Sequence, residues 1–376
     1  MRIGLSTTTI EPALTQGKID GIGVYTRALL QGLPEHGCDV TGFAYPPPAG
    51  AGNGGDIRFT SGQPMAHSYP ASTLLDLFTP DSRRKKMPVD LFHATDYRII
   101  RMDCPVVATL HDAIPLKYPH WCSPRLRRLK NMLLQRAAKN ADHVIAVSEY
   151  AVAELVECFG IDQRNITVVH NGVGQEWLAA PEPAAVSGTL LEYGLRAGYY
   201  LFVGTLQPRK NVERILAAYR QLPPAIRAER QLVIVGHAGW QCDDLVRQLR
   251  AAQQQGENVL WLDNVGDSAR LRQLYAGAGA FVFPSLYEGF GIPVAEAFAA
   301  GVPVITSNTT SLPEVSQGAA LEIDPLSVAD IGAAMQALAQ DDALRARCIE
   351  GGRKRAATLS WETTASRTAD VYRRFL

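Results

Sequence analysis

Short runs of β-branched and aromatic residues alternate with helical patterns along nearly the whole chain, and this alternation constrains the fold most. Such alternation is typical of βαβ units in parallel sheets. Six runs fall in the first half and five in the second, so we expect two doubly wound sheets in an α/β fold. The expected strands are 3–6, 40–44, 89–93, 106–110, 144–147 and 166–169, then 200–203, 232–235, 259–262, 280–283 and 302–305.

The boundary between two domains is expected after Gly172. Asn171 and Gly172 form a turn signal directly after a strand, and the segment 181–185 carries no apolar period. A chain of 376 residues has room for two domains that each bury a core. The expected division is a domain at 1–172, an interdomain linker at 173–198, a second domain at 199–356 and a terminal helix at 357–376.

The charges balance, because 37 lysines and arginines face 37 aspartates and glutamates. No overall field draws such a chain to nucleic acid, and any attraction to a membrane must be local. Six cysteines stand far apart without metal-ligand spacing, which indicates reduced thiols and no metal site. Because no signal peptide or long apolar stretch is evident, we expect a cytoplasmic protein.

Two acids and two glycines follow the expected strand 280–283. Glu288 and Gly291 belong to a loop, and Glu296 lies one turn inside the helix that a proline opens. Glycines let the backbone approach a ligand closely, and a helix start offers free amides to an anion. This arrangement at the carboxyl end of a strand favours an anion site flanked by two carboxylates over two unrelated surface charges.

Two adjacent cations follow the strand 200–203. Asn211 is expected to cap a helix, which places Arg209 and Lys210 beside the positive end of the helix dipole. Two cations there repel each other unless an anion joins them. The pattern therefore favours an anion-binding pair over two solvated charges.

Two further features leave alternatives open, and a third has a structural role. Gly21 and Gly23 form either a phosphate loop or a flexible turn, because Thr26 replaces the last glycine of the dinucleotide fingerprint. His111 follows the strand 106–110 and is either a ligand contact or a buried, hydrogen-bonded imidazole. The segment Ser311–Glu314 matches a capping box, which is a structural role.

Basic residues cluster at 83–86 and again at Arg125–Arg136. In the second cluster the apolar positions Leu126, Leu129, Leu133 and Ala137 recur at helical spacing. This pattern predicts an amphipathic basic helix, which is either a solvated face or a peripheral contact with anionic lipid.

The pair Glu288 and Glu296, separated by seven residues, resembles the signature of the retaining glycosyltransferases of family 4. Other segments that look like blocks of that family are 147–150, 171–173, 204–211 and 301–305. The resemblance covers nearly the whole chain. It implies the GT-B fold, in which two Rossmann-like domains face each other across a cleft.

The resemblance also assigns roles in the second domain. Glu288 would bind donor-sugar hydroxyls, and Glu296 would bind the nucleotide ribose. Arg209 and Lys210 would neutralise the diphosphate. The backbone amides that would assist them belong to Phe290, Gly291 and Ile292. In the first domain the implied donor contacts are Gly21, Gly23 and His111, with His111 near the reacting carbon of the sugar.

One position departs from the family pattern. Gly204 opens the phosphate block, but Thr205 stands where many members carry arginine. The sequence therefore leaves open which cation meets which phosphate.

The segments 109–115 and 204–211 look similar to bacterial mannosyltransferases that use GDP-mannose in surface polysaccharide synthesis. The implied reaction is front-side, retaining hexosyl transfer to a saccharide or lipid-linked saccharide, with no metal or other cofactor. UDP-glucose and UDP-N-acetylglucosamine remain alternative donors. The acceptor loops are expected at 46–55 and 61–82. Two other classes remain, a nucleotide-binding oxidoreductase and a catalytically silent subunit of the same fold.

Overall fold

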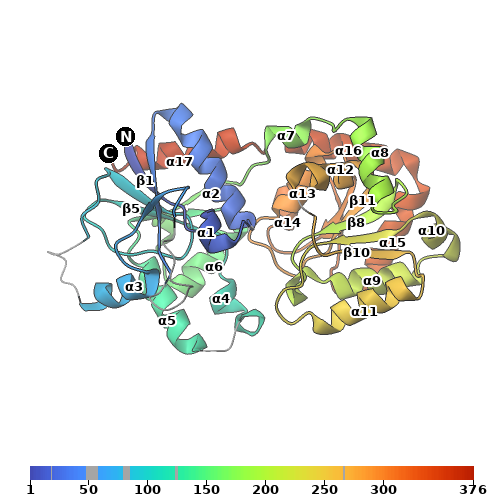
Figure 1. The fold of residues 1–376 in the computed structure, drawn as a ribbon, viewed down its shortest axis with the longest axis horizontal. Coiled ribbons are helices and arrows are strands. Elements are labelled where there is room, and N and C mark those ends of the chain that lie inside the picture. The colour runs from blue at the N-terminus through green and yellow to red at the C-terminus, as the bar shows by residue number, and fades with distance from the viewer. Residues whose placement is uncertain (18, 48–57, 79–84, 123–125, 266) are drawn as a thin grey trace. The chain divides into compact units, whose positions relative to one another are not determined.

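The computed structural model describes residues 1–17, 19–47, 58–78, 85–122, 126–265 and 267–376. This part of the chain divides into two compact units (Figure 1). Unit 1 consists of Met1–Gly172 together with Trp361–Leu376, and unit 2 is Val173–Ser360. None of the described helices has the length and hydropathy needed to cross a membrane.

All strands pair in parallel, as the alternation predicts. The strand order is β3-β2-β1-β4-β5-β6-β7 in unit 1 and β10-β9-β8-β11-β12-β13 in unit 2. In unit 1 the strands are β1 (Arg2–Ser6), β2 (Asp39–Ala44), β3 (Gln63–Pro64), β4 (Leu91–Ala94), β5 (Val106–Leu110), β6 (His143–Ala146) and β7 (Ile166–Val168). In unit 2 they are β8 (Tyr199–Val203), β9 (Leu232–Val235), β10 (Val259–Leu262), β11 (Ala278–Phe283), β12 (Val304–Ser307) and β13 (Leu321–Ile323).

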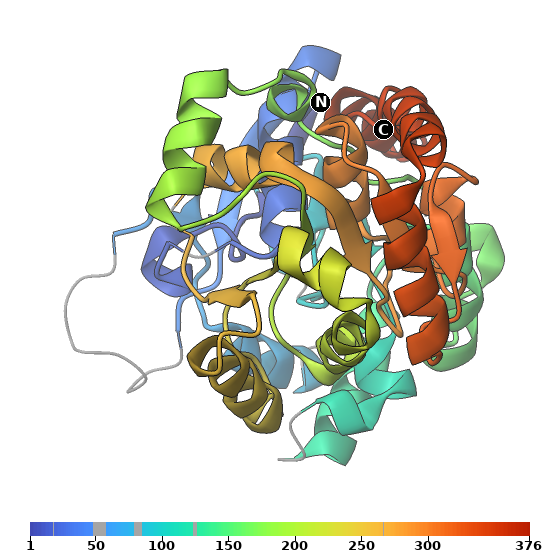
Figure 2. The ribbon, with the colours of Figure 1, turned by 90° about the vertical axis from the view of Figure 1, so that its right-hand side faces the viewer.

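Helices alternate with the strands along the chain and pack around the sheets in both units (Figures 1 and 2). In unit 1 they are α1 (Pro12–Thr15), α2 (Gly21–Gly32), α3 (Tyr69–Phe78), α4 (Ile114–Lys117), α5 (Arg127–Ala138), α6 (Glu149–Phe159) and α17 (Trp361–Tyr372). In unit 2 they are α7 (Gln175–Leu178), α8 (Pro183–Glu192), α9 (Val212–Gln221), α10 (Pro224–Glu229), α11 (Asp243–Gln254), α12 (Ser268–Gly277), α13 (Ile292–Ala299), α14 (Leu312–Ser316), α15 (Val328–Gln340) and α16 (Asp342–Ala356). Short 3₁₀ turns are η1 (Leu33–His36), η3 (Pro119–Trp121), η4 (Gln163–Asn165) and η5 (Pro208–Lys210).

The two edge strands β3 and β13 were not predicted. β3 has two residues, and β13 has three with the acidic Glu322 at its centre. Such short pieces carry neither an apolar run nor a period of two, so the sequence offers no signal for them. Of the expected acceptor loops, residues 48–55 and 79–82 lie outside the described residues, as do Arg83, Arg84 and Arg125.

The sheet of unit 1 is buried on both faces. Ile3 and Leu5 of β1 pack with Tyr25 and Leu29 of α2 and with α17 on one face. Phe92 and Ala108 belong to a second apolar cluster on the other face. Side chains alternate between the faces along each strand, so near-continuous apolar strands are what a doubly covered sheet requires.

Residues 173–198 were expected to be an interdomain linker, and this prediction is wrong. These residues belong to unit 2 and contain α7 and α8. Pro183 occupies the first turn of α8, where its missing amide costs nothing. Thr189 Oγ1 donates to Gln273 of α12 at 2.6 Å, which ties α8 to unit 2. The sparse apolar pattern reflects a helix that buries only its last turn.

Both sheets reverse their strand order at one point, between β1 and β4 in unit 1 and between β8 and β11 in unit 2. The loops that leave the carboxyl ends of two strands at such a switch diverge to opposite sides and leave room for a ligand. In unit 2 these are the loops 204–211 and 284–291. They carry most of the site residues that the sequence predicts.

Candidate functional site

The two loops at the switch point of unit 2 meet through an ion-paired triad. Lys210 Nζ lies 2.6 Å from Glu288 Oε1, and Arg209 Nη1 lies 3.0 Å from Glu288 Oε2. Arg209 also donates to the carbonyl oxygen of Tyr287 at 3.1 Å, and its own carbonyl accepts from Leu286 N at 2.7 Å. The structure thus brings together three residues that the sequence placed at separate strand ends.

The triad is largely removed from water. Lys210 and Glu288 are both 7% exposed, and Lys210 Nζ lies 4.7 Å from the centre of the Phe283 ring. Burial and the neighbouring charge of Arg209 lower the pKa of Lys210 to about 8, although Glu288 opposes them. Burial alone would raise the pKa of Glu288, but Lys210 and Arg209 outweigh it and hold that pKa below its ordinary value. Two cations and one carboxylate leave one net positive charge.

Backbone geometry brings the strand ends close together. A Cβ atom on Gly236, at the end of β9, would lie 2.0 Å from the carbonyl oxygen of Gly204 at the end of β8. Only glycine permits that approach. Thr205 is exposed, and Leu206 pairs with residues after β9 through a bond from its amide to His237 O at 2.8 Å. In the loop 204–211, Arg209 and Lys210 supply the two cations that contact Glu288, whereas the arginine that many family members carry is replaced by Thr205.

Asn211 has a different role from the one expected. It occupies the residue before α9 with a left-handed φ of 62°, but its side chain does not cap the helix. Its Nδ2 instead lies 2.9 Å from Pro284 O and 2.7 Å from Pro325 O. An amide nitrogen carries two donors, so Asn211 fastens the loop after β8 to the loop after β11.

Ser311 likewise does not form the expected capping box. Its side chain makes no cap bond to α14. Its Oγ lies 2.9 Å from the carbonyl oxygens of both Glu288 and Phe290. The hydroxyl is buried and serves as a second anchor for the loop 284–291. The sequence did not predict this role, because a serine hydroxyl can either cap a helix or bond to a distant loop.

Helix α13 begins at the end of this loop. Gly291 precedes it with φ of 110°, and no side chain caps its first turn. A left-handed residue at this position favours glycine. Pro293 has no amide hydrogen and Val294 N donates to Gly291 O at 3.0 Å, so an anion at this turn would meet the amides of Gly291 and Ile292. The contact of the Phe290, Gly291 and Ile292 amides with a diphosphate stays a prediction.

Glu296 is half-buried on α13 and lies away from the triad's ion pairs. Its Oε2 lies 3.5 Å from the hydroxyl of Tyr275 on α12. Burial and, to a smaller extent, the charge of Glu176 raise the pKa of Glu296 to about 7, while the Tyr275 hydroxyl opposes them. Tyr275 packs edge to face against Trp177 of α7, with ring centres 5.1 Å apart.

Sequence reasoning missed the neighbours of Glu296. Trp177 and Glu176 lie in the segment expected to be a linker, and Tyr275 lies in a segment for which no strand or site was expected. No motif marks them. Trp177 and Tyr275 stand far apart in the chain, so their ring contact leaves no signal in the sequence.

The remaining predicted residues lie in unit 1. Gly21 and Gly23 are in the first turn of α2, not in a flexible turn, and Asp20 Oδ1 accepts from Gly23 N at 2.9 Å. A Cβ atom on Gly23 would lie 2.4 Å from Ile19 Cγ2 and 2.9 Å from Thr9 O, so packing requires this glycine.

His111 is a buried imidazole in a defined setting. Its Nε2 lies 3.0 Å from Thr95 O, at the end of β4, and its ring meets Tyr25 edge to face at 5.0 Å. A carbonyl oxygen only accepts, so Nε2 carries the hydrogen. Burial lowers the pKa of His111. The contact of Gly21, Gly23 and His111 with a donor stays a prediction.

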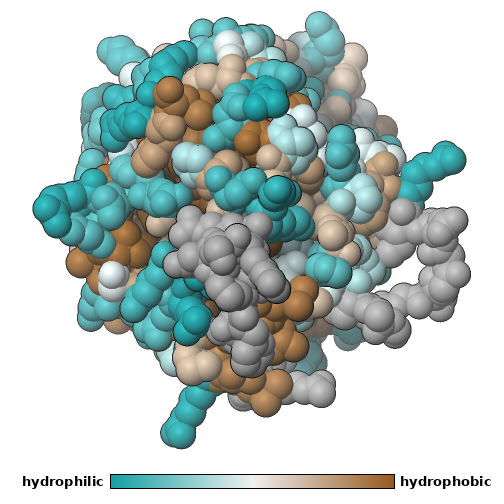
Figure 3. All heavy atoms as spheres, turned by 90° about the vertical axis from the view of Figure 1, so that its left-hand side faces the viewer, coloured by the Kyte–Doolittle hydropathy of each residue, from teal (hydrophilic) through white to brown (hydrophobic). Residues whose placement is uncertain are grey.

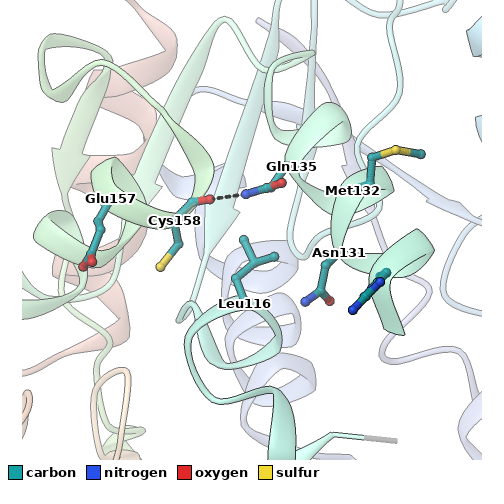
Figure 4. Close-up of a pocket in the computed structure, with 7 residues that line it drawn as sticks. Leu116, Asn131, Met132, Gln135, Glu157 and Cys158 are labelled. Carbon is teal, nitrogen blue, oxygen red and sulfur yellow. Dashed lines mark hydrogen bonds between the residues drawn. The ribbon is translucent and has the colours of Figure 1, made fainter. Parts of the chain in front are cut away.

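A shallow groove of about 460 Å³ lies elsewhere in unit 1, among α4, α5 and α6 (Figure 4). None of the site residues predicted from the sequence motifs lines it. Its lining consists of Leu116, Arg128, Asn131, Met132, Gln135, Glu157 and Cys158.

Comparison with known proteins shows the family to which the chain belongs. The family model of glycosyl transferases group 1 matches residues 195–355, and that of Glycosyltransferase Family 4 matches residues 19–177. O-antigen chain mannosyltransferase B of Escherichia coli is 32% identical over 286 residues, which are 75% of this chain and 74% of that protein.

Two solved structures resemble the whole chain. Sucrose-phosphate synthase from Thermosynechococcus elongatus aligns with a TM-score of 0.74 at 21% identity, over 100% of this chain and 98% of that one. Anabaena Alr3699/HepE in complex with UDP-glucose aligns with a TM-score of 0.72 at 17% identity, over 100% of both. At these identities the likeness shows the fold, which is GT-B.

Proposed function

The chain belongs to glycosyltransferase family 4, and from that premise we propose that it transfers mannose from GDP-mannose to a saccharide or lipid-linked saccharide during surface polysaccharide synthesis. The observation that carries the proposal is the triad of Arg209, Lys210 and Glu288 beside the uncapped start of α13. The mannose donor rests on the similarity to the E. coli O-antigen mannosyltransferase.

The triad suits a diphosphate leaving group. Transfer breaks the bond between the anomeric carbon and the diphosphate oxygen, and that oxygen gains negative charge as the bond lengthens. Two fixed cations and the amides of α13 stabilise the charge where it develops, and one such donor is typically worth about 3 kcal/mol. These groups supply the charge that a metal ion would otherwise supply, so we propose a metal-independent reaction.

Glu288 links donor binding to the cations. Its carboxylate pairs with both Lys210 and Arg209 and balances one of their two charges. When a diphosphate takes over part of that pairing, the carboxylate oxygens become available to accept from donor-sugar hydroxyls. Glu296, with its raised pKa, would bind the ribose.

The stereochemistry that we propose is retention by same-face transfer. The two cations already engage Glu288, which makes it a poor nucleophile for a covalent intermediate. The acceptor oxygen then attacks the anomeric carbon from the side of the departing phosphate, and the phosphate takes the acceptor's proton. His111 in its neutral form would lie near the reacting carbon.

The donor is tested first by ligand-induced thermal stabilisation. A ligand that binds only the native state raises the melting temperature. We expect GDP and GDP-mannose to do so more than UDP and UDP-glucose. The reverse order would select the alternative donor, which the UDP-glucose complex of Alr3699/HepE makes the natural competitor.

Transfer itself is tested with the selected donor and a mannose-containing acceptor. NMR of the product should show the anomeric configuration of the donor, and an inverted product would exclude same-face transfer. Turnover should persist in EDTA. Absence of any transfer would favour a catalytically silent subunit. We propose that the reaction takes place in the cytoplasm, and fractionation of cells that produce the protein tests this.

A further inference from the structure

Exposed apolar side chains gather on two helices of unit 1. Among the described residues, ten large hydrophobic side chains are exposed, and five of them lie on or directly before α3 and α5. The other five are Leu376 and four residues scattered over unit 2. We call the five the α3–α5 surface: Leu74, Leu75, Leu126, Leu129 and Met132.

The two helices adjoin at their carboxyl-terminal ends. Asn140, just after α5, donates from Nδ2 to Asp76 Oδ2 of α3 at 3.1 Å. Figure 3 shows hydrophobic side chains reaching the surface at the lower edge of this face, where Figure 1 draws α3 and α5. Isolated exposed leucines are ordinary, but Leu126, Leu129 and Met132 expose three large apolar side chains at every third position from the residue before α5 through its first half, and such a stripe marks a contact surface.

The same surface is positively charged. Helix α5 contains three arginines, one lysine and no acidic residue. Arg128, Lys130 and Arg136 are exposed between the leucines, whereas Leu133 is half-buried and Ala137 is buried. The apolar stripe expected from the sequence is therefore corrected: its first two positions, together with Met132, face solvent, and its last two pack inward.

The groove beside α5 is lined by a carboxylate and by two amides that already donate to carbonyl oxygens. Asn131 Nδ2 already donates to Pro115 O at 2.9 Å, and Gln135 Nε2 donates to Cys158 O at 2.7 Å (Figure 4). Glu157 adds a carboxylate to the lining, with its side chain 72% exposed. The basic side chains that would attract an anionic partner thus lie on the open face of α5. Such a face fits an extended anionic surface rather than a single bound ion.

We propose that the α3–α5 surface docks unit 1 on an anionic phospholipid bilayer. Leu126, Leu129 and Met132 would enter the interface, while Arg128 and Lys130 meet lipid phosphates. Apolar burial and attraction to anionic headgroups add in such contacts. The contact does not depend on which nucleotide-sugar the protein uses.

The test is flotation of the full chain with vesicles, without nucleotide. We expect binding to vesicles of phosphatidylglycerol and phosphatidylcholine in equal parts, release at high salt, and no binding to phosphatidylcholine alone. Each basic residue removed should weaken partitioning about fivefold, so Arg128→Gln with Lys130→Gln should weaken it roughly 25-fold. Leu129→Ser with Met132→Ser should also abolish most binding.

Matched controls lie on unit 2. Arg247→Gln with Arg347→Gln removes the same charge, and Leu191→Ser with Leu326→Ser removes the same kind of exposed leucine. Both should bind as the parent does. Melting temperatures identify any variant that folds poorly, and the salt and lipid dependence of the parent then carries the test alone.

Three outcomes would overturn the proposal. The parent could stay unbound on anionic vesicles, or the controls could weaken binding as much as the α5 variants. The parent could instead form a dimer that Leu129→Ser with Met132→Ser dissociates, with no vesicle binding, in which case the surface belongs to a second copy. The nucleotide-induced thermal shift is measured separately, so failure of the donor assignment is recognised independently.

Discussion

One carboxylate of Glu288 holds two cations, with Lys210 Nζ 2.6 Å from Oε1 and Arg209 Nη1 3.0 Å from Oε2. The acid and the bases come from loops that follow two different strands, and Asn211 and Ser311 fix both loops to each other and to their surroundings. The fold itself therefore holds the three charged side chains of the site together. A diphosphate that binds here has to compete with Glu288 for Lys210 and Arg209.

Replacing Lys210 with methionine should lower kcat by about 100- to 1,000-fold, because one donor to the developing phosphate charge is lost. Steady-state transfer assays with the donor chosen by thermal shift measure this. Arg220→Met is the control, since Arg220 on α9 forms a partly exposed pair with Glu257 at 2.7 Å. Full turnover in the Lys210 variant would remove it from the site.

The triad should also show coupling in stability. Lys210→Met leaves the buried Glu288 with Arg209 alone and should lower the free energy of unfolding by about 3 kcal/mol. The double variant Lys210→Met with Glu288→Gln should lose less free energy of unfolding than the sum of the losses in the two single variants. Urea unfolding of the four proteins completes the cycle. Strict additivity would mean that the ion pair contributes no coupling.

The pH dependence of stability should report Glu296. Its folded pKa is raised to about 7 from an ordinary value of 4.5, so between these values the folded protein holds a proton that the unfolded chain has lost. Stability from this group therefore falls as pH rises through that window. Between pH 4.5 and pH 8, the free energy of unfolding of Glu296→Gln should rise relative to that of the parent by up to about 3 kcal/mol.

The measurement is the difference in unfolding free energy between parent and variant across that range. Taking the difference matters because other groups act with the opposite sign. Burial lowers the pKa of His93 to about 3. The stability that neutral His93 contributes is therefore lost as the pH falls below the ordinary histidine pKa of 6.5. A flat difference would show that Glu296 titrates normally.

Two glycines in helices should respond in opposite directions. Gly23→Ala places a Cβ atom against Ile19 and against the Thr9 backbone, and should destabilise the protein by about 1–3 kcal/mol. Gly188 in α8 has nothing within 4 Å of its Cβ position, so Gly188→Ala should stabilise by about 0.5–1 kcal/mol. Thermal unfolding of both variants tests this, and equal shifts would contradict the packing account of Gly23.

The C-terminal helix should contribute through a buried hydrogen bond. Tyr372 Oη lies 2.6 Å from His93 Nδ1, and His93 Nε2 lies 2.8 Å from Thr109 Oγ1. Tyr372→Phe leaves the imidazole nitrogen unpaired and should cost about 1–3 kcal/mol. Arg373→Met, exposed one residue later, should cost far less. Equal losses would mean that the helix acts through packing alone.

The sheets were predictable because parallel strands buried on both faces must be apolar throughout. The eleven expected strands all occur, and the expected positions of Arg209, Lys210, Glu288 and Glu296 at or after strand ends follow from the same pattern. Short edge strands leave no such pattern, which explains why β3 and β13 were missed.

Side-chain partners were much less predictable. Asn211 and Ser311 both have the residue type of a helix cap, and both use their polar atoms on a distant loop instead. Local sequence fixes which hydrogen-bonding group is available but not which carbonyl the tertiary fold brings within reach. The basic helix was recognised from its spacing, whereas its exposed stripe depends on how α5 packs.

Because unit 1 includes Trp361–Leu376, the chain leaves it after Gly172 and returns only after Ser360. The two crossing segments lie side by side, with Val173 N bonded to Leu359 O at 3.0 Å. During synthesis, unit 2 is therefore complete before unit 1 receives the helix that covers one face of its sheet. Until α17 is made, α2 covers Ile3, Leu5 and Leu91 without the part of the apolar cover that Ala365, Ala369 and Tyr372 supply.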